Sequence, residues 1–197
     1  MCLSNCKQVA NESDITCYKY VVIKHDKDSK YIAICSPFHS SYRWRLGQTY
    51  YSHPLKEDYP NSDNGYRDIG IGFFHVMSSP YRAIDIAKEF NPDEEDDIMA
   101  VIQCTIPDKH KADTYYGDVN GSGDVGYATN CLKTEKIIYL DKPKFSWCKY
   151  CSIGENIRDY KRYRKRMKAY NEIKKEFNLD ESNCYFGEDT HSRLCIW

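Results

Sequence analysis

The stretch Ile69–Phe90, IGIGFFHVMSSPYRAIDIAKEF, decides the fold class more than any other part of the chain. An apolar run over residues 71–77 is rich in residues that favour strands, and His75 is its one ionisable residue. Ser79 followed by Pro80 is typical of a helix start, because serine caps the first free N–H groups and proline suits the first helical position. The stretch therefore predicts a buried strand that leads almost directly into a helix.

The rest of the chain predicts strands that come mostly in runs, without regular alternation with helices. We expect strands over residues 15–24, 31–35, 98–106, 114–116, 127–133 and 135–140, and a long helix over 155–178. Only Thr134 separates the last two strands, so either one long strand or a bulged corner is expected there. This order favours an α+β fold: a mixed, mainly antiparallel twisted sheet with one short packed helix (80–90) and a long C-terminal helix.

The length of 197 residues suits one domain. We expect a polar, loosely ordered N-terminal segment over residues 1–14 and an α+β core domain over 15–140. Residues 141–197 are expected to form a connector, a long basic amphipathic helix and a docked tail of the same domain. Apolar residues recur along the helix at steps of three and four, which predicts one continuous helical stripe.

Composition limits the class and the compartment of the protein. Aromatic residues make up 14% of the chain and include 18 tyrosines, which argues against disorder of the whole chain. The net charge of −1 gives no global field that would attract nucleic acid. No apolar stretch has the length of a signal peptide or a membrane span, so a soluble cytoplasmic protein is expected. In that compartment the ten cysteines are expected to be thiols or metal ligands.

Several short motifs, taken in order, resemble those of a known group of proteins. They are M-C-L at residues 1–3, D-I-T-C-Y-K at 14–19, G-F-F-H at 72–75, Y-Y-G at 115–117 and Y-A-T at 127–129. The chain resembles, over roughly residues 1–140, a group of small uncharacterised proteins from gut bacteria, Bacteroides-like, and their phages. The group has no established activity, so the resemblance implies a cytoplasmic bacterial or phage origin and no catalytic role.

Cysteine spacing predicts a metal site near residue 150. Cys148 and Cys151 form a C-x-x-C motif, the spacing that lets two thiolates bind one tetrahedral zinc ion. Further ligands are available in Cys184, His191 and Cys195, or in Cys2 and Cys6, and the set Cys148, Cys151, Cys184 and Cys195 is our candidate metal site. The alternative is a group of half-buried thiols around Trp147 and Trp197.

The loop over residues 118–124 matches the first half of an EF-hand calcium loop, with glycine at the sixth position. Position twelve is Thr129 instead of the glutamate that completes such a site, and the flanking segments are predicted strands. A glycine-rich turn between strands is therefore the favoured interpretation.

A catalytic alternative uses three residues on separate predicted strands. The order His75, then Tyr116 or Tyr127, then Glu135 is the order in which ADP-ribosyltransferase-like folds hold NAD. The set His75, Tyr127 and Glu135 therefore predicts an NAD-handling transferase or hydrolase. The competing interpretation is a core histidine whose nitrogens are satisfied by the backbone or by tyrosine.

The long helix carries seven basic residues within eleven positions: Arg158, Lys161, Arg162, Arg164, Lys165, Arg166 and Lys168. Interleaved with tyrosines, they predict a surface that could neutralise phosphates and stack a base. The alternatives are an ordinary solvated helix face, or a helix that docks on the acidic loop 93–97 of a second copy. We expect a non-enzymatic binding or interaction module whose partner is a nucleic acid or a protein, with homo-oligomerisation possible and no membrane partner.

Overall fold

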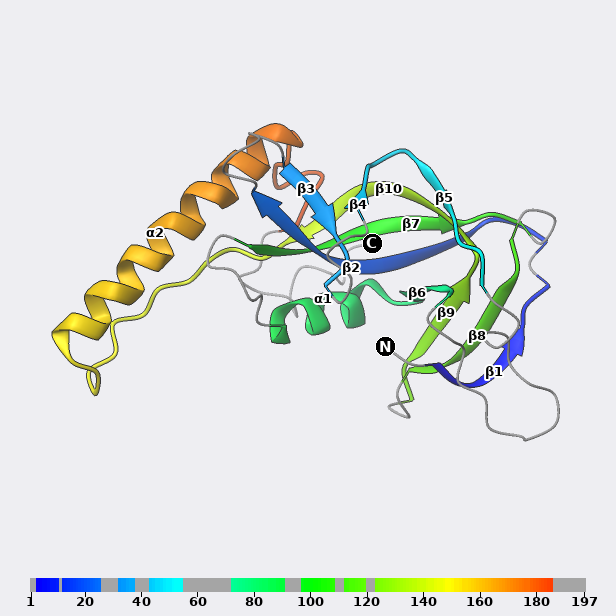
Figure 1. Ribbon diagram of the computed structural model, residues 1–197, viewed down its shortest axis with the longest axis horizontal. Helices are drawn as coiled ribbons and strands as arrows, with labels where there is room; N and C mark the ends of the chain where they lie inside the picture. Colours follow the sequence, from blue (N-terminus) through cyan, green and yellow to red (C-terminus); the bar gives the residue numbers. More distant parts are fainter. Residues whose placement is uncertain are drawn as a thin grey trace. The chain divides into compact units, whose positions relative to one another are not determined.

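The computed structural model describes residues 3–10, 12–25, 32–37, 43–54, 72–90, 97–108, 112–119 and 123–185. These residues form ten strands and two helices (Figure 1). The strands are β1 (Leu3–Gln8), β2 (Ile15–His25), β3 (Ile32–Cys35), β4 (Arg43–Trp44), β5 (Thr49–Tyr51), β6 (Phe74–Met77), β7 (Ile98–Ile106), β8 (Thr114–Val119), β9 (Val125–Thr129) and β10 (Cys131–Leu140). The helices are α1 (Pro80–Glu89) and α2 (Ile153–Glu176).

All ten strands belong to one sheet, in the order β1-β8-β9-β6-β2-β7-β10-β5, with β3 paired to β2 and to β4. Each strand pair with a described register is antiparallel. The predicted α+β class and the mainly antiparallel sheet are confirmed, with more strands than expected because the segments around β4 and β5 also pair. Among the described helices, none is long and apolar enough to cross a membrane.

The chain divides into two compact units. Unit 1 comprises Met1–Tyr20, Arg45–Asp85 and Val101–Lys136, and unit 2 comprises Val21–Trp44, Ile86–Ala100 and Ile137–Trp197. Strands β2, β7 and β10 contribute residues to both units. Strand β7, predicted with the same bounds, is buried at each of its first five residues, so both of its faces are covered there.

Unit 1 is built around the antiparallel strands β1, β8, β9 and β6, which pair in that order. The prediction of a loosely ordered N-terminal segment was wrong for residues 3–8, because β1 pairs with β8 from Leu3↔Val119 to Gln8↔Tyr115. Leu3 is fully buried although its neighbours in the sequence are polar. A single buried leucine gives too little periodicity for the strand to be recognised from sequence.

Gly126 on β9 marks the tightest contact of this core. A Cβ atom at this position would lie 2.9 Å from Val76 O, 2.9 Å from Val119 Cγ2 and 3.0 Å from Leu3 Cδ2. The substitution Gly126→Ala is therefore expected to lower the free energy of unfolding by about 1–3 kcal/mol, because strands β6, β8 and β1 must move apart. Urea denaturation followed by circular dichroism measures this change.

Gly154 on α2 supplies a matched control for this substitution. The nearest atom to a Cβ added there is Ser152 Oγ, at 4.0 Å, and alanine has the higher helix propensity. Gly154→Ala is expected to leave the stability unchanged or to raise it by up to about 1 kcal/mol. If Gly126→Ala lowered the free energy of unfolding no more than Gly154→Ala does, the packing around Gly126 would not be tight.

The predicted strand–helix unit is present, with a shorter strand than expected. Strand β6 begins at Phe74, and α1 begins at Pro80 as predicted. The Ser78 hydroxyl donates to the carbonyl of Val125 at 2.8 Å, and the Ser79 carbonyl accepts from the N–H of Ala83 at 3.3 Å. Ser78 thus links the end of β6 to β9, and the helix starts immediately afterwards.

The corner between the last two strands lies at Asn130 and not at Thr134. The Asn130 side chain accepts from the N–H of Asp113 at 2.8 Å and donates to its carboxylate at 3.2 Å. The Thr134 hydroxyl donates to the carbonyl of Arg45 at 2.6 Å inside a continuous strand. Asparagine favours turns and threonine favours strands, so the residue types at the two positions agree with the observed break.

Unit 2 contains the C-terminal half of β2, strands β3 and β4, and α2. Strand β3 pairs with β2 from Val22↔Cys35 to His25↔Ile32, which confirms the predicted hairpin. The end of α2 is anchored by the buried residues Ala169, Tyr170 and Ile173. After the helix, the Tyr185 carbonyl accepts from the N–H of Leu140 at 3.0 Å, and the rings of Tyr139 and Tyr185 stack with centroids 6.0 Å apart.

Candidate binding surface and metal-binding turn

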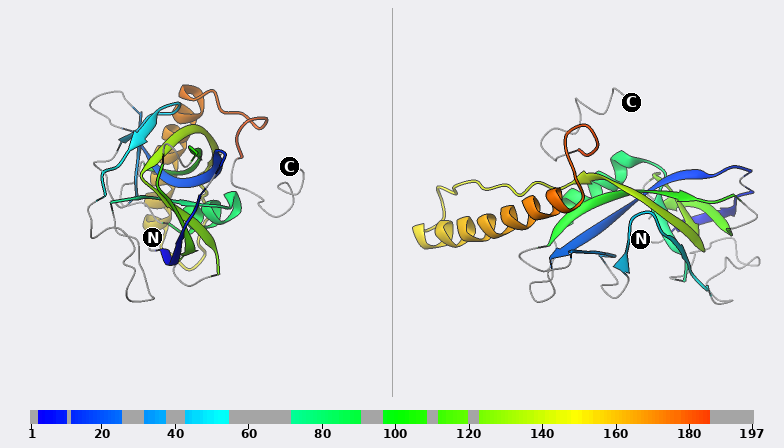
Figure 2. Two further views of the ribbon diagram at one scale, coloured as in Figure 1. Left: turned by 90° about the vertical axis from the view of Figure 1, so that its right-hand side faces the viewer. Right: turned by 90° about the horizontal axis from the view of Figure 1, so that it is seen from above.

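Residues 141–176 of unit 2 form an element that we call the arm: a connector over 141–152 followed by α2. In Figure 1 and in the right-hand view of Figure 2, the connector runs beside the helix, and the N-terminal half of α2 extends beyond the strands of unit 2. The ring of Phe145 lies 5.3 Å from that of Tyr160 and 5.8 Å from that of Tyr163. These aromatic contacts hold the connector against the helix.

The start of α2 is fixed by a capping box. The Ser152 hydroxyl oxygen accepts from the Glu155 N–H at 3.2 Å. The Glu155 carboxylate accepts from the N–H and from the hydroxyl of Ser152, both at 2.8 Å. These two bonds to the carboxylate lower the pKa of Glu155. The sequence Ser-x-x-Glu thus satisfies two otherwise unpaired groups and sets the helix start at Ile153.

A buried amide, Asn156, joins the first turn of α2 to the C-x-x-C motif. Its side-chain oxygen accepts from the Cys148 N–H at 2.8 Å. Its nitrogen donates to the carbonyls of Cys148, Cys151 and Ser152 at 3.0, 3.3 and 3.1 Å. The Cys151 N–H also bonds to the Cys148 carbonyl at 3.3 Å, which closes a turn. Asn156 is only 2% exposed, so this turn is held in one conformation.

The two thiols of this turn have different acidities. Hydrogen bonds from the Cys151 thiol and from the backbone of Tyr150 lower the pKa of Cys148. The same bond between the thiols raises the pKa of Cys151 to about 11. The lowered pKa favours the thiolate form of Cys148, which is the form that binds metals.

Large apolar side chains gather around this turn and are exposed; we call them the tip patch. They are Trp147, Tyr150, Ile153 and Ile157, with exposed fractions of 58%, 87%, 71% and 45%. Ile153 and Ile157 lie one helical turn apart and so share a face of α2. Scattered apolar residues on a surface are ordinary, whereas several within eleven consecutive residues form a candidate interaction surface.

Four of the seven predicted basic residues share one face of α2; we call them the basic stripe. Arg158, Lys161, Arg162 and Lys165 have the spacing i, i+3, i+4 and i+7, and all four are exposed. Arg162 makes a long ion pair of 4.0 Å with Asp159. Such exposed pairs contribute little to stability, so another anion can replace Asp159 with little loss of stability.

Charge is strongly divided between the arm and the rest of the chain. Residues 141–176 contain twelve Lys or Arg against five Asp or Glu. The remaining residues contain sixteen basic against twenty-four acidic side chains. The near-zero net charge of the whole chain therefore hides a positively charged arm.

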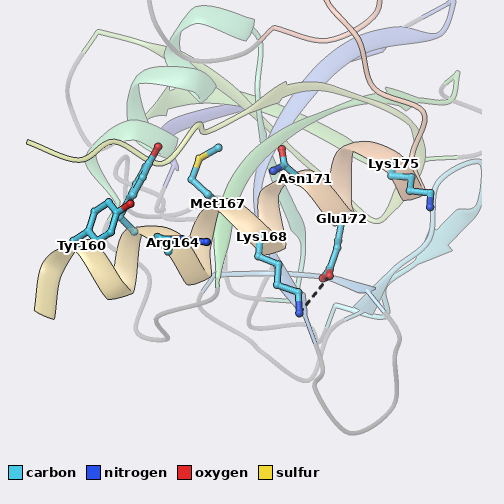
Figure 3. A pocket seen from close by; sticks show the side chains of 8 residues that line it. Tyr160, Arg164, Met167, Lys168, Asn171, Glu172 and Lys175 are labelled. Atoms are coloured by element: carbon cyan, nitrogen blue, oxygen red, sulfur yellow. Dashed lines mark ion pairs between the residues drawn. The ribbon is translucent and has the colours of Figure 1, made fainter. Parts of the chain in front are cut away.

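A shallow groove of about 550 Å³ follows another face of α2 (Figure 3). It is lined by Tyr160, Tyr163 and Met167 and by a row of polar and charged side chains. The row includes two of the predicted basic residues, Arg164 and Lys168, and Lys168 pairs with Glu172 at 3.9 Å. Arg166, the seventh, is half-buried. The groove thus combines aromatic rings with cations, a combination that suits a planar anionic ligand such as a nucleotide base with its phosphate.

The predicted catalytic residues do not meet in one cleft. His75 is opposite Ala128, whereas Tyr127 is opposite Val76 and also opposite Tyr116. Residues directly opposite each other share a face of the sheet and consecutive residues alternate, so His75 and the two tyrosines project from opposite faces. The hypothesis of a shared His–Tyr cleft was wrong for this reason.

Glu135 is separated from His75 by two intervening strands. Strands β2 and β7 lie between β6 and β10 in the sheet order, which corresponds to about 14 Å at normal strand spacing. The Glu135 carboxylate pairs with Lys133 of the same strand at 2.9 Å. The structure therefore supports no chemistry that needs His75, Tyr127 and Glu135 together.

Lys19 and two nearby cysteines form another cluster of ionisable side chains in unit 1. The Lys19 amine donates to the carbonyl of His75 at 3.0 Å, and burial lowers its pKa. Burial raises the pKa of Cys17, and it raises the pKa of Cys104 to about 12, so both nearby thiols stay protonated. Protonated, buried thiols behave as small apolar side chains, and we assign them a packing role.

The predicted four-cysteine metal site is not assembled. Cys184 is buried beyond the C-terminal end of α2, whereas Cys148 and Cys151 precede its N-terminal end. The helix has 24 residues and is therefore about 36 Å long, so Cys184 cannot bind the same ion as the C-x-x-C pair of its own chain. Cys195, like His191 and Cys2, lies outside the described residues. Within the part of the chain that the structure describes, no three His, Cys, Asp or Glu side chains cluster as a metal site.

The loop at 118–124 connects β8 to β9, which pair up to Asp118↔Val125. Asp118 accepts from the N–H of Gly123 at 3.0 Å, and Asp124 pairs with Arg82 at 2.6 Å. Gly123 has a φ of +78°, a conformation that favours glycine. The described part of this segment lies between two strands, as the favoured interpretation predicts, and residues 120–122 lie outside the described residues.

Searches with protein-family models, curated proteins and solved structures gave no match for this chain. The resemblance to proteins of gut bacteria and their phages therefore stays a prediction, as does the cytoplasmic location.

Two parts of the arm were missed by the sequence analysis. One is Asn156, whose four hydrogen bonds to the C-x-x-C turn leave no sequence signal beyond a polar residue on a helix. The other is the tip patch, because exposed and buried apolar residues look alike in a sequence. The Ser-x-x-Glu pair ahead of the helix was an available signal for the helix start.

Proposed function

We propose that the protein is a non-enzymatic binding module that holds single-stranded nucleic acid along its arm. The observation that carries the proposal is the basic stripe: Arg158, Lys161, Arg162 and Lys165 share one exposed face of an element that is itself strongly positive. Such a row presents four cations to one anionic backbone, and each neutralised phosphate releases counterions.

Exposed aromatic rings support the choice of a single strand over a duplex. Tyr160 is exposed, and its ring and that of Tyr163 line the groove beside Arg164. Unpaired bases stack on such rings, whereas the bases of a duplex are already stacked on each other. A partner protein with an acidic surface would use the stripe but would not need these rings.

Fluorescence anisotropy with labelled single-stranded DNA and RNA of mixed sequence tests the proposal. We expect binding that weakens as salt is added, with a slope of about −3 in a plot of log K against log salt if all four stripe residues neutralise phosphates. A duplex of the same length is expected to bind more weakly. Absence of binding at low salt, or binding that salt does not affect, would contradict the proposal.

A further inference from the structure

The C-x-x-C turn has the features of half a metal site. The Asn156 amide bonds to the backbone of both cysteines, and the Cys151 N–H donates to the Cys148 carbonyl at 3.3 Å, so one tight turn carries both side chains. Cys151 is exposed and Cys148 is half-buried, so an ion can reach both sulfur atoms. Paired thiolates are soft ligands that favour tetrahedral zinc.

Two ligands do not complete a tetrahedral site. The described residues hold no third His, Cys, Asp or Glu near the turn that would form a cluster, and Cys184 lies at the far end of α2. The turn instead sits at the end of the arm, where it faces outward. The missing ligands are therefore most simply supplied by a second molecule that approaches this end.

The tip patch indicates that this second molecule is another copy of the same chain. Trp147, Tyr150, Ile153 and Ile157 surround the turn and are exposed. In a two-fold contact, the same patch on both copies would be covered while the two turns face each other. The same contact would then bury the apolar side chains of both tip patches and bind the metal ion.

We propose that two copies of the chain share one Zn²⁺ ion, bound by Cys148 and Cys151 of each copy. The four thiols release their protons on binding, so four thiolates and one Zn²⁺ leave a charge of about −2 at the centre. Lys149, which lies between the two cysteines with its amine 4.9 Å from the Tyr150 ring centroid, offsets part of this charge in each copy. This site is independent of the basic stripe, so it does not rest on the proposed function.

Metal content and molar mass, measured on the full chain purified under reducing conditions with zinc, test this proposal. We expect one zinc per two chains and a molar mass twice the 23.1 kDa of the monomer. Chelation with EDTA is expected to give a metal-free monomer, and added Zn²⁺ to restore the dimer. Replacement by Co²⁺ is expected to give the visible absorption of a tetrahedral tetrathiolate site.

The double variant Cys148→Ser with Cys151→Ser is expected to be a metal-free monomer with the thermal melting curve of the EDTA-treated wild type, because both residues lie at an exposed end of the arm. Cys195→Ser is the control and is expected to keep both metal and dimer. One zinc per chain in a monomer would overturn the proposal, as would loss of zinc in Cys195→Ser. A reduced protein that retains no zinc, or a dimer that survives EDTA, would overturn it as well.

Discussion

Replacing the four residues of the basic stripe with glutamine is expected to weaken binding of single-stranded oligonucleotides by roughly 100-fold at low salt. The variant carries Arg158→Gln, Lys161→Gln, Arg162→Gln and Lys165→Gln. Each lost cation removes one phosphate contact, so the slope of log K against log salt is expected to become shallower by about three. Anisotropy titrations of wild type and variant, at several salt concentrations, measure both effects.

A control variant with the same change of charge separates the stripe from net charge. Lys7, Arg43, Arg45 and Lys136 are exposed and lie outside the arm. Their replacement by glutamine is expected to leave the salt slope unchanged and to alter affinity less than threefold, since none of these residues belongs to the row that neutralises phosphates. Equal losses in the two variants would show that binding depends on net charge and not on the stripe.

Asn156→Ala is expected to release the C-x-x-C turn from the helix. The substitution removes the side-chain partner of the Cys148 N–H and of the Cys151 carbonyl, whereas the Cys148 and Ser152 carbonyls keep the backbone N–H groups of residues 151 and 156. We expect the free energy of local opening to fall by about 2 kcal/mol. This corresponds to a roughly 30-fold faster hydrogen exchange at the backbone amides of residues 151 and 156. Exchange measured by NMR or mass spectrometry on residues 147–156 gives this quantity.

Asn171→Ala is the matched control, because Asn171 is an exposed asparagine on the same helix. Both variants gain the same helix propensity, so their difference isolates the hydrogen bonds of Asn156. We expect Asn171→Ala to leave exchange at the turn unchanged. If Asn156→Ala also left it unchanged, the amide would not be what holds the turn.

The sequence predicted the long, strongly patterned elements of the fold and missed the short ones. The continuous apolar run of β7 and the three- and four-residue steps of α2 each show one period over many residues. Strand β4 has two residues and β5 has three, which is too short for a period to appear. They become strands through pairing with β3 and β10, which is a tertiary effect.

The sequence predicted which types of residue make up the candidate site. It did not predict how they are arranged. The C-x-x-C spacing and the basic residues were visible, but the helical period was needed to place Arg158, Lys161, Arg162 and Lys165 on one face. The predicted metal site was wrong to include Cys184, because the 24-residue helix α2 separates Cys184 from Cys148 and Cys151. Asn156 was missed because its hydrogen bonds go to a turn whose conformation the sequence does not specify.

The catalytic hypothesis illustrates a different limit. It required His75 and Tyr127 to share a face of the sheet, and this depends on strand register. A shift of one residue between β6 and β9 would have placed them together. Register follows from packing on both faces and from the turns, so residue order along the chain cannot decide it.

The proposed binding of nucleic acid along the arm is tested by photo-crosslinking a 4-thiouridine oligonucleotide to the wild-type chain. Mass spectrometry then identifies the linked peptides. The proposed binding surface predicts that the linked peptides come from residues 158–168, with Tyr160 or Tyr163 as the modified residue. Crosslinks confined to the strands of unit 1, or none above the level of a denatured control, would contradict it.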